Sequence, residues 1–211
     1  TLPSDSGTSH ASVVDGDGNA VAFTTTINTG FGSKLLVGGF VLNNEMDDFS
    51  TPGRSNAYGL APSEANYIRP GKRPLSSMSP TIAIQPALVN GSATTLVRAA
   101  VGASGGSKII SATLQALARY LLRDRDARAA VSESRVHHQF LPNVVYVEDF
   151  ELLDGTWEVV PESVREGLRA RGHVVRPWGS HAVVQAVVRD LDTLELTAVS
   201  DARKGGVPSC G

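Results

Sequence analysis

The sequence predicts an α+β fold that combines antiparallel β-hairpins with a few amphipathic helices. Residues 10–15 and 20–27 flank Gly16-Asp17-Gly18-Asn19, and Gly and Asn tolerate the positive φ that a tight hairpin turn requires. Further along, apolar residues recur at helical spacing between Ser107 and Arg123. The 211 residues, 41% of them hydrophobic, can bury a core within the size range of one domain.

Composition and charge exclude several classes of partner. The formal net charge is −2 with both signs mixed, so there is no electrostatic reason to expect nucleic acid or an acidic membrane surface. Cys210 is the one cysteine, which excludes an intrachain disulfide or a cysteine metal site. No long apolar run or export-signal pattern is present, so we expect the chain as given neither to span a membrane nor to carry an export signal.

The first predicted strand begins at or beside Thr8, directly after Gly7. A Thr released as a new N-terminus would carry a hydroxyl nucleophile together with a base, its own α-amine. The second strand of the hairpin returns its far end toward Thr8. By the strand period of two, Thr24, Thr26 and Asn28 share one face there. This face is either an ordinary polar β-surface or a source of hydrogen bonds for Thr8.

A Gly-rich connection, residues 29–39, and a short apolar strand at 40–42 lead into a polar cluster. Its side chains are Asn43, Asn44, Glu45, Asp47 and Asp48. Carboxylates placed in this way bind an ammonium group, a metal ion or only water. The Asp-x-Asp-x-Asp-Gly spacing of a calcium loop is absent. A solvated loop and a cation site remain the alternatives.

Two irregular segments follow. Residues 50–68 form a long loop, and loops of this length are commonly functional lids or disordered segments. Tyr58, in its middle, either covers a pocket or packs the loop down. In residues 70–80, prolines flank Ser76 and Ser77, fix the backbone and leave hydroxyls and amides free to face one acceptor. Neither serine has the Gly-x-Ser-x-Gly frame of a nucleophile elbow.

Two apolar strands at 81–84 and 94–100, joined by a turn at 90–91, precede a Gly-rich turn at 102–107 that opens the helix at 107–123. Such a turn presents backbone N–H groups at the positive end of the helix dipole. It is not a P-loop, because Lys108 is misplaced for that motif. An oxyanion hole and a simple tight turn remain open.

The last third of the sequence predicts structural elements only. We expect helices at 126–134 and 161–171, a strand at 143–148, and a hairpin of 183–189 with 194–200. His137 and His138 are adjacent, so they face different ways and cannot chelate one metal well. We interpret them as structural or surface residues. The tail, 201–211, is irregular.

Together these motifs resemble the small subunit of the γ-glutamyltranspeptidases, members of the N-terminal nucleophile hydrolase superfamily. The resemblance runs from Thr8 almost to the last residue, with one departure at Ser209-Cys210-Gly211, where a tyrosine is more usual. It rests on stretches in the same order as in the family: Thr8-Ser9-His10, Thr26-Ile27-Asn28, residues 42–49, residues 70–80, Gly102-Ala103-Ser104-Gly105-Gly106 and Asp201-Ala202-Arg203-Lys204-Gly205-Gly206.

The resemblance implies a four-layer αββα sandwich of two stacked, mainly antiparallel sheets flanked by helices, built by two subunits. Residues 1–7 would be the tail of the large subunit before the processing site. Residues 8–211 would be the small-subunit domain, which is incomplete without the large subunit and therefore exposes apolar surface. The family implies an extracellular, periplasmic, membrane-anchored or vacuolar location, set by the large subunit.

The implied activity is γ-glutamyl transfer and hydrolysis. A precursor would cleave itself between Gly7 and Thr8, and Thr8 would then form an acyl-enzyme with glutathione or another γ-glutamyl compound. Water, an amino acid or a dipeptide would resolve it. The resemblance implies that Thr26 hydrogen-bonds the nucleophile and that the Gly105 and Gly106 amides form the oxyanion hole. It implies no cofactor, metal or nucleic acid.

The resemblance also implies how the substrate is held. The α-ammonium would be bound by Asn28, Glu45 and Asp48. The α-carboxylate would be bound by Ser76 and Ser77, together with an arginine of the large subunit. Residues 50–68, with Tyr58, would form a lid over the glutamyl pocket.

Two rival functions remain. One is a related amidase, such as a cephalosporin or glutaryl acylase or a poly-γ-glutamate processing enzyme, although the acidic cluster with the serine pair favours a free γ-glutamyl group. The other is an unprocessed, inactive fragment or homologue with a binding or structural role, because seven residues precede Thr8 and block its amine.

Overall fold

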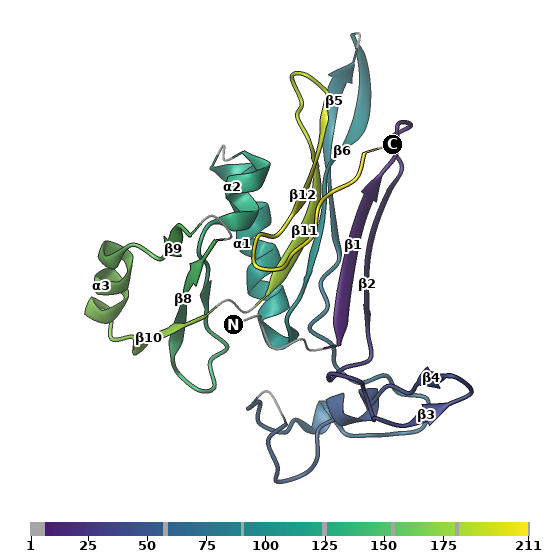
Figure 1. Ribbon diagram of the computed structural model, residues 1–211, viewed down its shortest axis with the longest axis vertical. Coiled ribbons are helices and arrows are strands. Elements are labelled where there is room, and N and C mark those ends of the chain that lie inside the picture. Colours follow the sequence, from purple (N-terminus) through teal and green to yellow (C-terminus); the bar gives the residue numbers. More distant parts are fainter. Residues whose placement is uncertain are drawn as a thin grey trace.

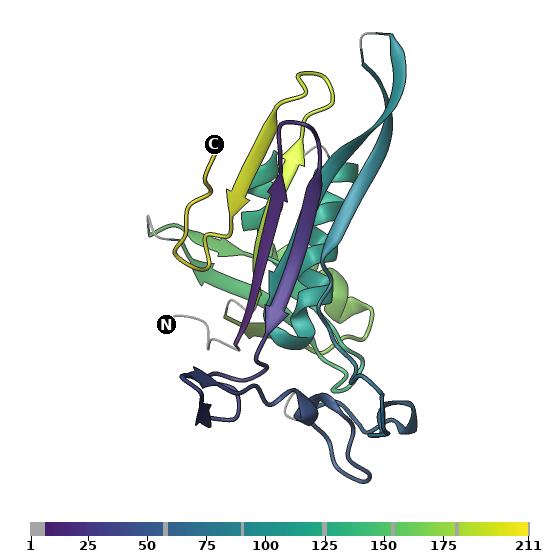
Figure 2. The same ribbon diagram turned by 90° about the vertical axis from the view of Figure 1, so that its right-hand side faces the viewer.

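The computed structural model of the chain is built around two stacked antiparallel sheets (Figure 1). It describes residues 7–56, 59–89, 91–123, 126–152, 155–179 and 182–210. The first sheet pairs β1 (Thr8–Val14) with β2 (Ala20–Thr26). The second has the strand order β12 (Leu196–Ser200), β11 (Val183–Arg189), β6 (Ser92–Ser104), β5 (Thr81–Val89). Figure 2 shows the first sheet lying across β6 and β11.

The β1–β2 hairpin confirms the prediction made from its turn. Its register runs from Thr8 opposite Thr26 to Val14 opposite Ala20. In the turn, the Asp15 carboxylate accepts hydrogen bonds from two backbone N–H groups, those of residues 17 and 19. Such Asx-type bonding stabilises a tight turn. The bonds join residues that are close in sequence, which is why the local sequence predicts this hairpin.

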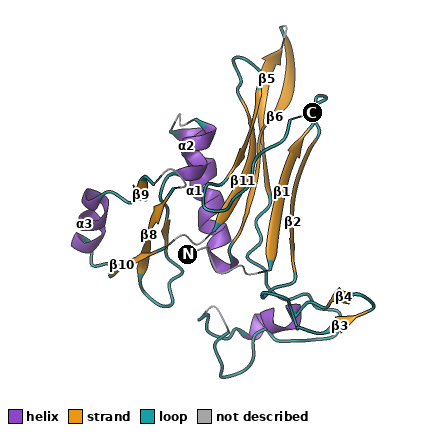
Figure 3. Ribbon diagram, viewed as in Figure 1, coloured by secondary structure: helices purple, strands orange, loops and turns teal. Residues whose placement is uncertain are grey.

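Helices cover the other face of the second sheet. α1 (Ile109–Leu122) and α2 (Ala127–Ser132) lie on the side away from β1 and β2 (Figure 3). The core between them is made largely of small residues, which let helix and sheet approach closely: Ala99, Val101, Ala103, Ala112, Ala116, Val184 and Ala186. The described residues thus form an α-β-β stack, and none of their helices covers the outer face of β1 and β2.

A smaller sheet extends the structure beside α1. β8 (Val145–Glu151) pairs with β7 (Val136–His137), with β9 (Trp157–Val159) and, in parallel, with β10 (Val175–Trp178). α3 (Glu162–Ala170) lies against it through Leu168. The sequence predicted β8 and α3 but not β7, β9 or β10, because strands of two to four residues carry too little alternation to be recognised.

A buried cluster of four charges joins this sheet to the end of the chain. Arg135 Nη2 lies 2.6 Å from Asp201 Oδ2, and Arg203 bridges Asp201 and Glu148 at 2.9 and 2.6 Å. All four residues are buried. Two residues of the Asp201–Gly206 stretch, Asp201 and Arg203, therefore have a structural role in this cluster.

Three boundaries near the site differ from the sequence-based expectation. β6 continues to Ser104, so Gly102 lies in a strand rather than in the Gly-rich turn. The connection after β2 contains a small hairpin of β3 (Leu36–Val37) and β4 (Phe40–Val41). The loop 50–68 contains a short 3₁₀ turn, η2 (Glu64–Asn66).

Candidate active site

Thr8 and Thr26 form the centre of the site. They are opposite each other in the hairpin on its inner face, and Thr8 Oγ1 lies 2.8 Å from Thr26 Oγ1. Directly opposed residues on one face of a hairpin bring their side chains together in this way. Thr8 is 6% exposed, and the backbone N–H of Asn28 donates to Thr26 Oγ1 at 2.8 Å. Asn28 itself is buried, with a φ of 70°.

The peptide bond before Thr8 is held on both sides. The Gly7 carbonyl accepts a hydrogen bond from the Ile27 N–H at 3.0 Å. Gly7 has a φ of +55°, and a Cβ there would lie 2.6 Å from the Thr29 carbonyl oxygen. Both the backbone conformation and the space therefore require glycine.

The glycine loop lies at the same end of the sandwich as Thr8 (Figure 1). β6 ends at Ser104, and a 3₁₀ turn, η3 (Gly106–Lys108), leads into the N-terminus of α1. Gly105 has a φ of 137° and Gly106 a φ of 60°, values that side-chain-bearing residues rarely adopt. The loop therefore depends on glycine at both positions.

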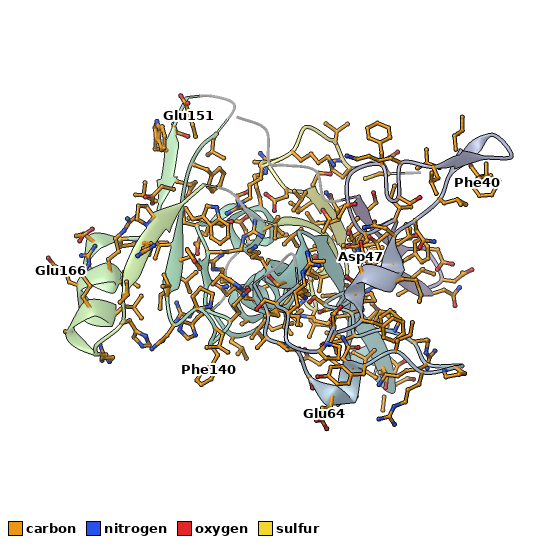
Figure 4. The ribbon with its side chains drawn as sticks, turned by 90° about the horizontal axis from the view of Figure 1, so that it is seen from below. Phe40, Asp47, Glu64, Phe140, Glu151 and Glu166 are labelled. Atoms are coloured by element: carbon orange, nitrogen blue, oxygen red, sulfur yellow. The ribbon has the colours of Figure 1, made fainter. Side chains whose placement is uncertain are left out.

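The acidic cluster forms a 3₁₀ turn, η1 (Glu45–Asp48), at this same end, where Figure 4 labels Asp47. Burial, followed by the charge of Asp48, raises the pKa of Glu45 to about 7, although Thr26 lowers it in part. Burial also raises the pKa of Asp48. Glu45 Oε1 is buried and has no hydrogen-bond partner among the described residues. A cation between these carboxylates would favour their charged forms.

A cleft of about 550 Å³ opens beside the acidic cluster. Its lining includes Asn28, Asn44, Asp47, Asp48, Ser50, Arg54 and Asn56. A second cleft of about 540 Å³ runs along β1 and β11 to the C-terminal segment, and none of the predicted site residues line it.

Two asparagines that the sequence analysis did not single out as site residues organise this end. Asn44 Oδ1 accepts from the N–H and hydroxyl of Thr29, and its carbonyl accepts from Asn28 Nδ2 at 3.2 Å. Asn66 Nδ2 donates to the Asp48 carbonyl at 2.7 Å, while its Oδ1 accepts from the Leu75 N–H. Asn66 thereby ties the acidic cluster to the segment that holds Ser76. Nothing local in the sequence indicates this contact.

The remaining predicted binding residues are Ser76, Ser77 and Tyr58. Ser76 Oγ accepts from the Met78 N–H at 3.2 Å, and the Ser77 carbonyl accepts from the Ser79 hydroxyl at 3.0 Å. These bonds stay within the segment, which enters β5 at the same end of the sandwich (Figure 1). Tyr58 lies outside the described residues.

The buried histidine outside this site, His137, has a structural role. His137 is buried, with Nδ1 2.8 Å from Ser111 Oγ and Nε2 3.0 Å from Gln139 Oε1. In the described part of the chain, no three His, Cys, Asp or Glu residues gather in a way that could hold a metal ion. No helix in that part is both long and apolar enough to cross a membrane.

Known proteins match most of this chain. The family model for γ-glutamyltranspeptidase matches residues 1–210. Glutathione hydrolase 2 of Arabidopsis thaliana is 41% identical over 97% of this chain, which spans 36% of that protein. Putative inactive glutathione hydrolase 4 of the same plant is 46% identical over 69% of this chain and 74% of its own length.

A crystal structure of a Helicobacter pylori γ-glutamyltranspeptidase mutant superimposes with a TM-score of 0.78 at 38% identity. The superposition covers 92% of this chain and 99% of the Helicobacter pylori chain. The fold is therefore that of the N-terminal nucleophile hydrolases, as the sequence predicted. More narrowly, the chain belongs to the γ-glutamyltranspeptidase family.

Proposed function

We propose that this chain is the catalytic small subunit of an enzyme that transfers and hydrolyses γ-glutamyl groups, with glutathione as a substrate. The observation that carries the proposal is the contact between the hydroxyls of buried Thr8 and half-buried Thr26, at the start of a strand that follows a glycine with positive φ. Membership of the γ-glutamyltranspeptidase family supports the substrate class.

The first step is the release of Thr8. Its hydroxyl attacks the Gly7 carbonyl carbon, the C–N bond breaks, and the acyl group moves from nitrogen to oxygen. Water then hydrolyses this ester, which leaves the Gly7 carboxylate and a free α-amine on Thr8. The positive φ of Gly7 and the hydrogen bond from Ile27 to its carbonyl support this step, because they hold the reacting bond in a fixed geometry.

In the processed chain, the α-amine of Thr8 is the general base. Its ordinary pKa of about 7.7–8.0 leaves a useful unprotonated fraction at neutral pH. It takes the hydroxyl proton as Thr8 Oγ1 attacks the γ-carbonyl carbon, and it returns the proton to the leaving amine. The Gly105 and Gly106 N–H groups stabilise the oxyanion, and one such donor is typically worth about 10²–10³ in rate. Water or an acceptor amine then takes the γ-glutamyl group.

The acidic cluster suits the α-ammonium of the substrate. Glu45 and Asp48 are two partly buried carboxylates whose raised pKa values reflect the cost of charging them without a cation. Asn28 is held next to this cluster, because its Nδ2 donates a hydrogen bond to the backbone carbonyl of Asn44. Ser76 and Ser77 supply hydroxyls or amides for the α-carboxylate. A glutaryl compound, which lacks the ammonium, would leave the carboxylates unpaired.

A large subunit of the same precursor is the proposed partner, with residues 1–7 as its tail. The outer face of the β1–β2 hairpin supports this, because Val13 and Val21 are each 57% exposed and Phe23 is 56% exposed. Contiguous apolar surface of this kind is commonly an interface. The chain also spans only about a third of Glutathione hydrolase 2.

The second candidate function is that of an inactive homologue. Its support is the similarity of this chain to a putative inactive glutathione hydrolase. The deciding experiment expresses the chain with its large subunit and compares a γ-glutamyl anilide with a glutaryl anilide. We expect cleavage at Gly7–Thr8 and turnover of the γ-glutamyl compound. No cleavage and no turnover would support the inactive homologue, and preference for the glutaryl compound would support an acylase.

A further inference from the structure

The inner face of β1 carries a histidine that no step of the proposed reaction uses. His10 lies two residues after Thr8 and opposite Thr24 in the hairpin. Its Nδ1 is 2.7 Å from Thr24 Oγ1, and its Nε2 is 2.9 Å from Ser12 Oγ. Ser12 Oγ donates to the Gln185 carbonyl on β11 at 3.2 Å. The His10 ring therefore connects both strands of the hairpin to the second sheet.

These bonds require a proton on Nε2 of the ring. A serine hydroxyl has one proton, and Ser12 gives that proton to the Gln185 carbonyl, so Ser12 Oγ must accept from His10 Nε2–H. Burial lowers the pKa of His10 to about 4, so the ring is neutral near pH 7. With the proton on Nε2, Nδ1 is the acceptor and the Thr24 hydroxyl donates to it. The hydrogen bonds and the burial together assign the neutral Nε2–H tautomer.

The ring also fills the place of a missing side chain on β6. A Cβ at Gly102 would lie 2.2 Å from His10 Cε1 and 2.5 Å from its Nδ1, well inside van der Waals contact. Gly102 pairs with Gln185, so the ring and Ser12 rest on adjacent strands at the same level. Side chains from stacked sheets normally interdigitate, and at Gly102 the His10 ring takes the space that a side chain on β6 would occupy.

This contact joins the two strands that carry the two halves of the candidate active site. Thr8 is two residues before His10 on β1, and Gly105 is three residues after Gly102 at the end of β6. We propose that neutral His10 is a positioning residue, which through its contact with Gly102 sets the distance between Thr8 and the Gly105 and Gly106 amides. The inference rests on the proposed function, in which those amides receive the oxyanion.

The consequence concerns rate more than binding. Misplacing a reacting group by about 1 Å can lower a rate by about 10²-fold. The proposed ammonium-binding residues Glu45 and Asp48 belong to another segment, so the affinity for the γ-glutamyl donor does not depend on the His10–Gly102 contact.

The test uses the complex with the large subunit and the variants His10→Ala, Gly102→Ala and the double variant. Each single change should lower kcat for a γ-glutamyl anilide by about 10²-fold and leave KM nearly unchanged. In the double variant the alanine methyl enters the space left by the ring, so the two effects should be strongly non-additive. Gly16→Ala is the matched control, because a Cβ there meets nothing within 4 Å. It should leave kcat unchanged.

Multiplicative effects of the two changes, or full activity of His10→Ala, would overturn the inference. Wild-type protein without γ-glutamyl activity would instead overturn the proposed function. If His10→Ala does not fold, His10→Gln, which keeps one donor and one acceptor, replaces it. A second readout is the ¹⁵N NMR spectrum of the wild-type imidazoles. A neutral Nε2–H ring for His10 at about pH 7 is expected, and an Nδ1–H or charged ring would contradict the assignment.

Discussion

The hydroxyl of Thr26 lies 2.8 Å from the hydroxyl of Thr8 and also accepts the backbone N–H of Asn28 at 2.8 Å. The Asn28 N–H fixes the orientation of Thr26, and Thr26 in turn fixes Thr8. Thr26→Val keeps the shape and removes the hydrogen bond to Thr8, which is worth about 1 kcal/mol, so we expect kcat to fall roughly fivefold. Steady-state kinetics with a γ-glutamyl anilide measures this, and Thr26→Ser should stay near wild type. Equal activity of the valine and serine variants would contradict it.

The acidic cluster predicts a specific pH dependence. Glu45 has a pKa of about 7 in the free protein, so it takes up a proton as the pH falls below about 7. An ammonium-bearing ligand binds the ionised form. Inhibition by glutamate should therefore weaken by up to about tenfold per pH unit from pH 7 downward.

Two comparisons make this pH prediction specific. Glutarate, which lacks the ammonium, should instead bind less well as the pH rises and Glu45 ionises. Glu45→Gln should weaken glutamate binding at about pH 8 and flatten its pH dependence. Parallel pH profiles for the two ligands would show that Glu45 does not bind the ammonium.

The conformation of Gly7 makes processing sensitive to a single methyl group. Gly7→Ala combines a positive φ with a Cβ 2.6 Å from the Thr29 carbonyl, so we expect cleavage at the Gly7–Thr8 bond to slow strongly. Gly18→Ala carries the same φ penalty, at φ +88°, but its Cβ meets nothing within 4 Å. Intact-mass time courses should show normal cleavage for Gly18→Ala. Equal slowing in both variants would show that the close approach of Thr29 is not what makes glycine necessary at position 7.

The buried charge cluster sets the acid stability. Burial alone would raise the pKa of Asp201, but Arg135 and then Arg203 outweigh it and hold that pKa below its ordinary 3.8. The stabilisation is therefore complete above about pH 4 and is lost as the pH falls through the lowered pKa. Asp201→Asn leaves Glu148 to balance two buried arginines and should cost about 3–5 kcal/mol in the free energy of unfolding.

Urea denaturation of the complex measures this loss for Asp201→Asn, with Asp192→Asn in the exposed β11–β12 turn as the control that should not change. The variant should also lose less stability than wild type on acidification below about pH 4. An unchanged unfolding midpoint for Asp201→Asn would show that the cluster adds nothing to stability.

Local signals were enough to predict much of the fold. The turn between β1 and β2 and the amphipathic pattern of α1 lie within short windows, and both elements are confirmed. The α+β sandwich is confirmed as well. The catalytic and binding roles assigned to individual residues stay predictions, although the structure does bring Thr8, Thr26 and Glu45 together.

The contacts that the sequence could not give are those between distant segments. Gly102 looked like part of a turn because glycines cluster there, but it lies in β6 where the His10 ring occupies its side-chain space. The Arg135–Asp201 pair and the bridging role of Asn66 depend in the same way on tertiary packing. No periodicity in a single sequence records such contacts.

The most direct measurement is the mass of the chain after reaction. The precursor is allowed to cleave, is mixed with a γ-glutamyl anilide, is quenched in acid and is digested for peptide mass analysis. We expect a peptide that begins at Thr8 and carries one γ-glutamyl group, retained in Thr8→Ser and absent in Thr8→Ala. A chain that stays uncleaved at Gly7–Thr8, or a γ-glutamyl group on any other residue, would contradict Thr8 as the nucleophile.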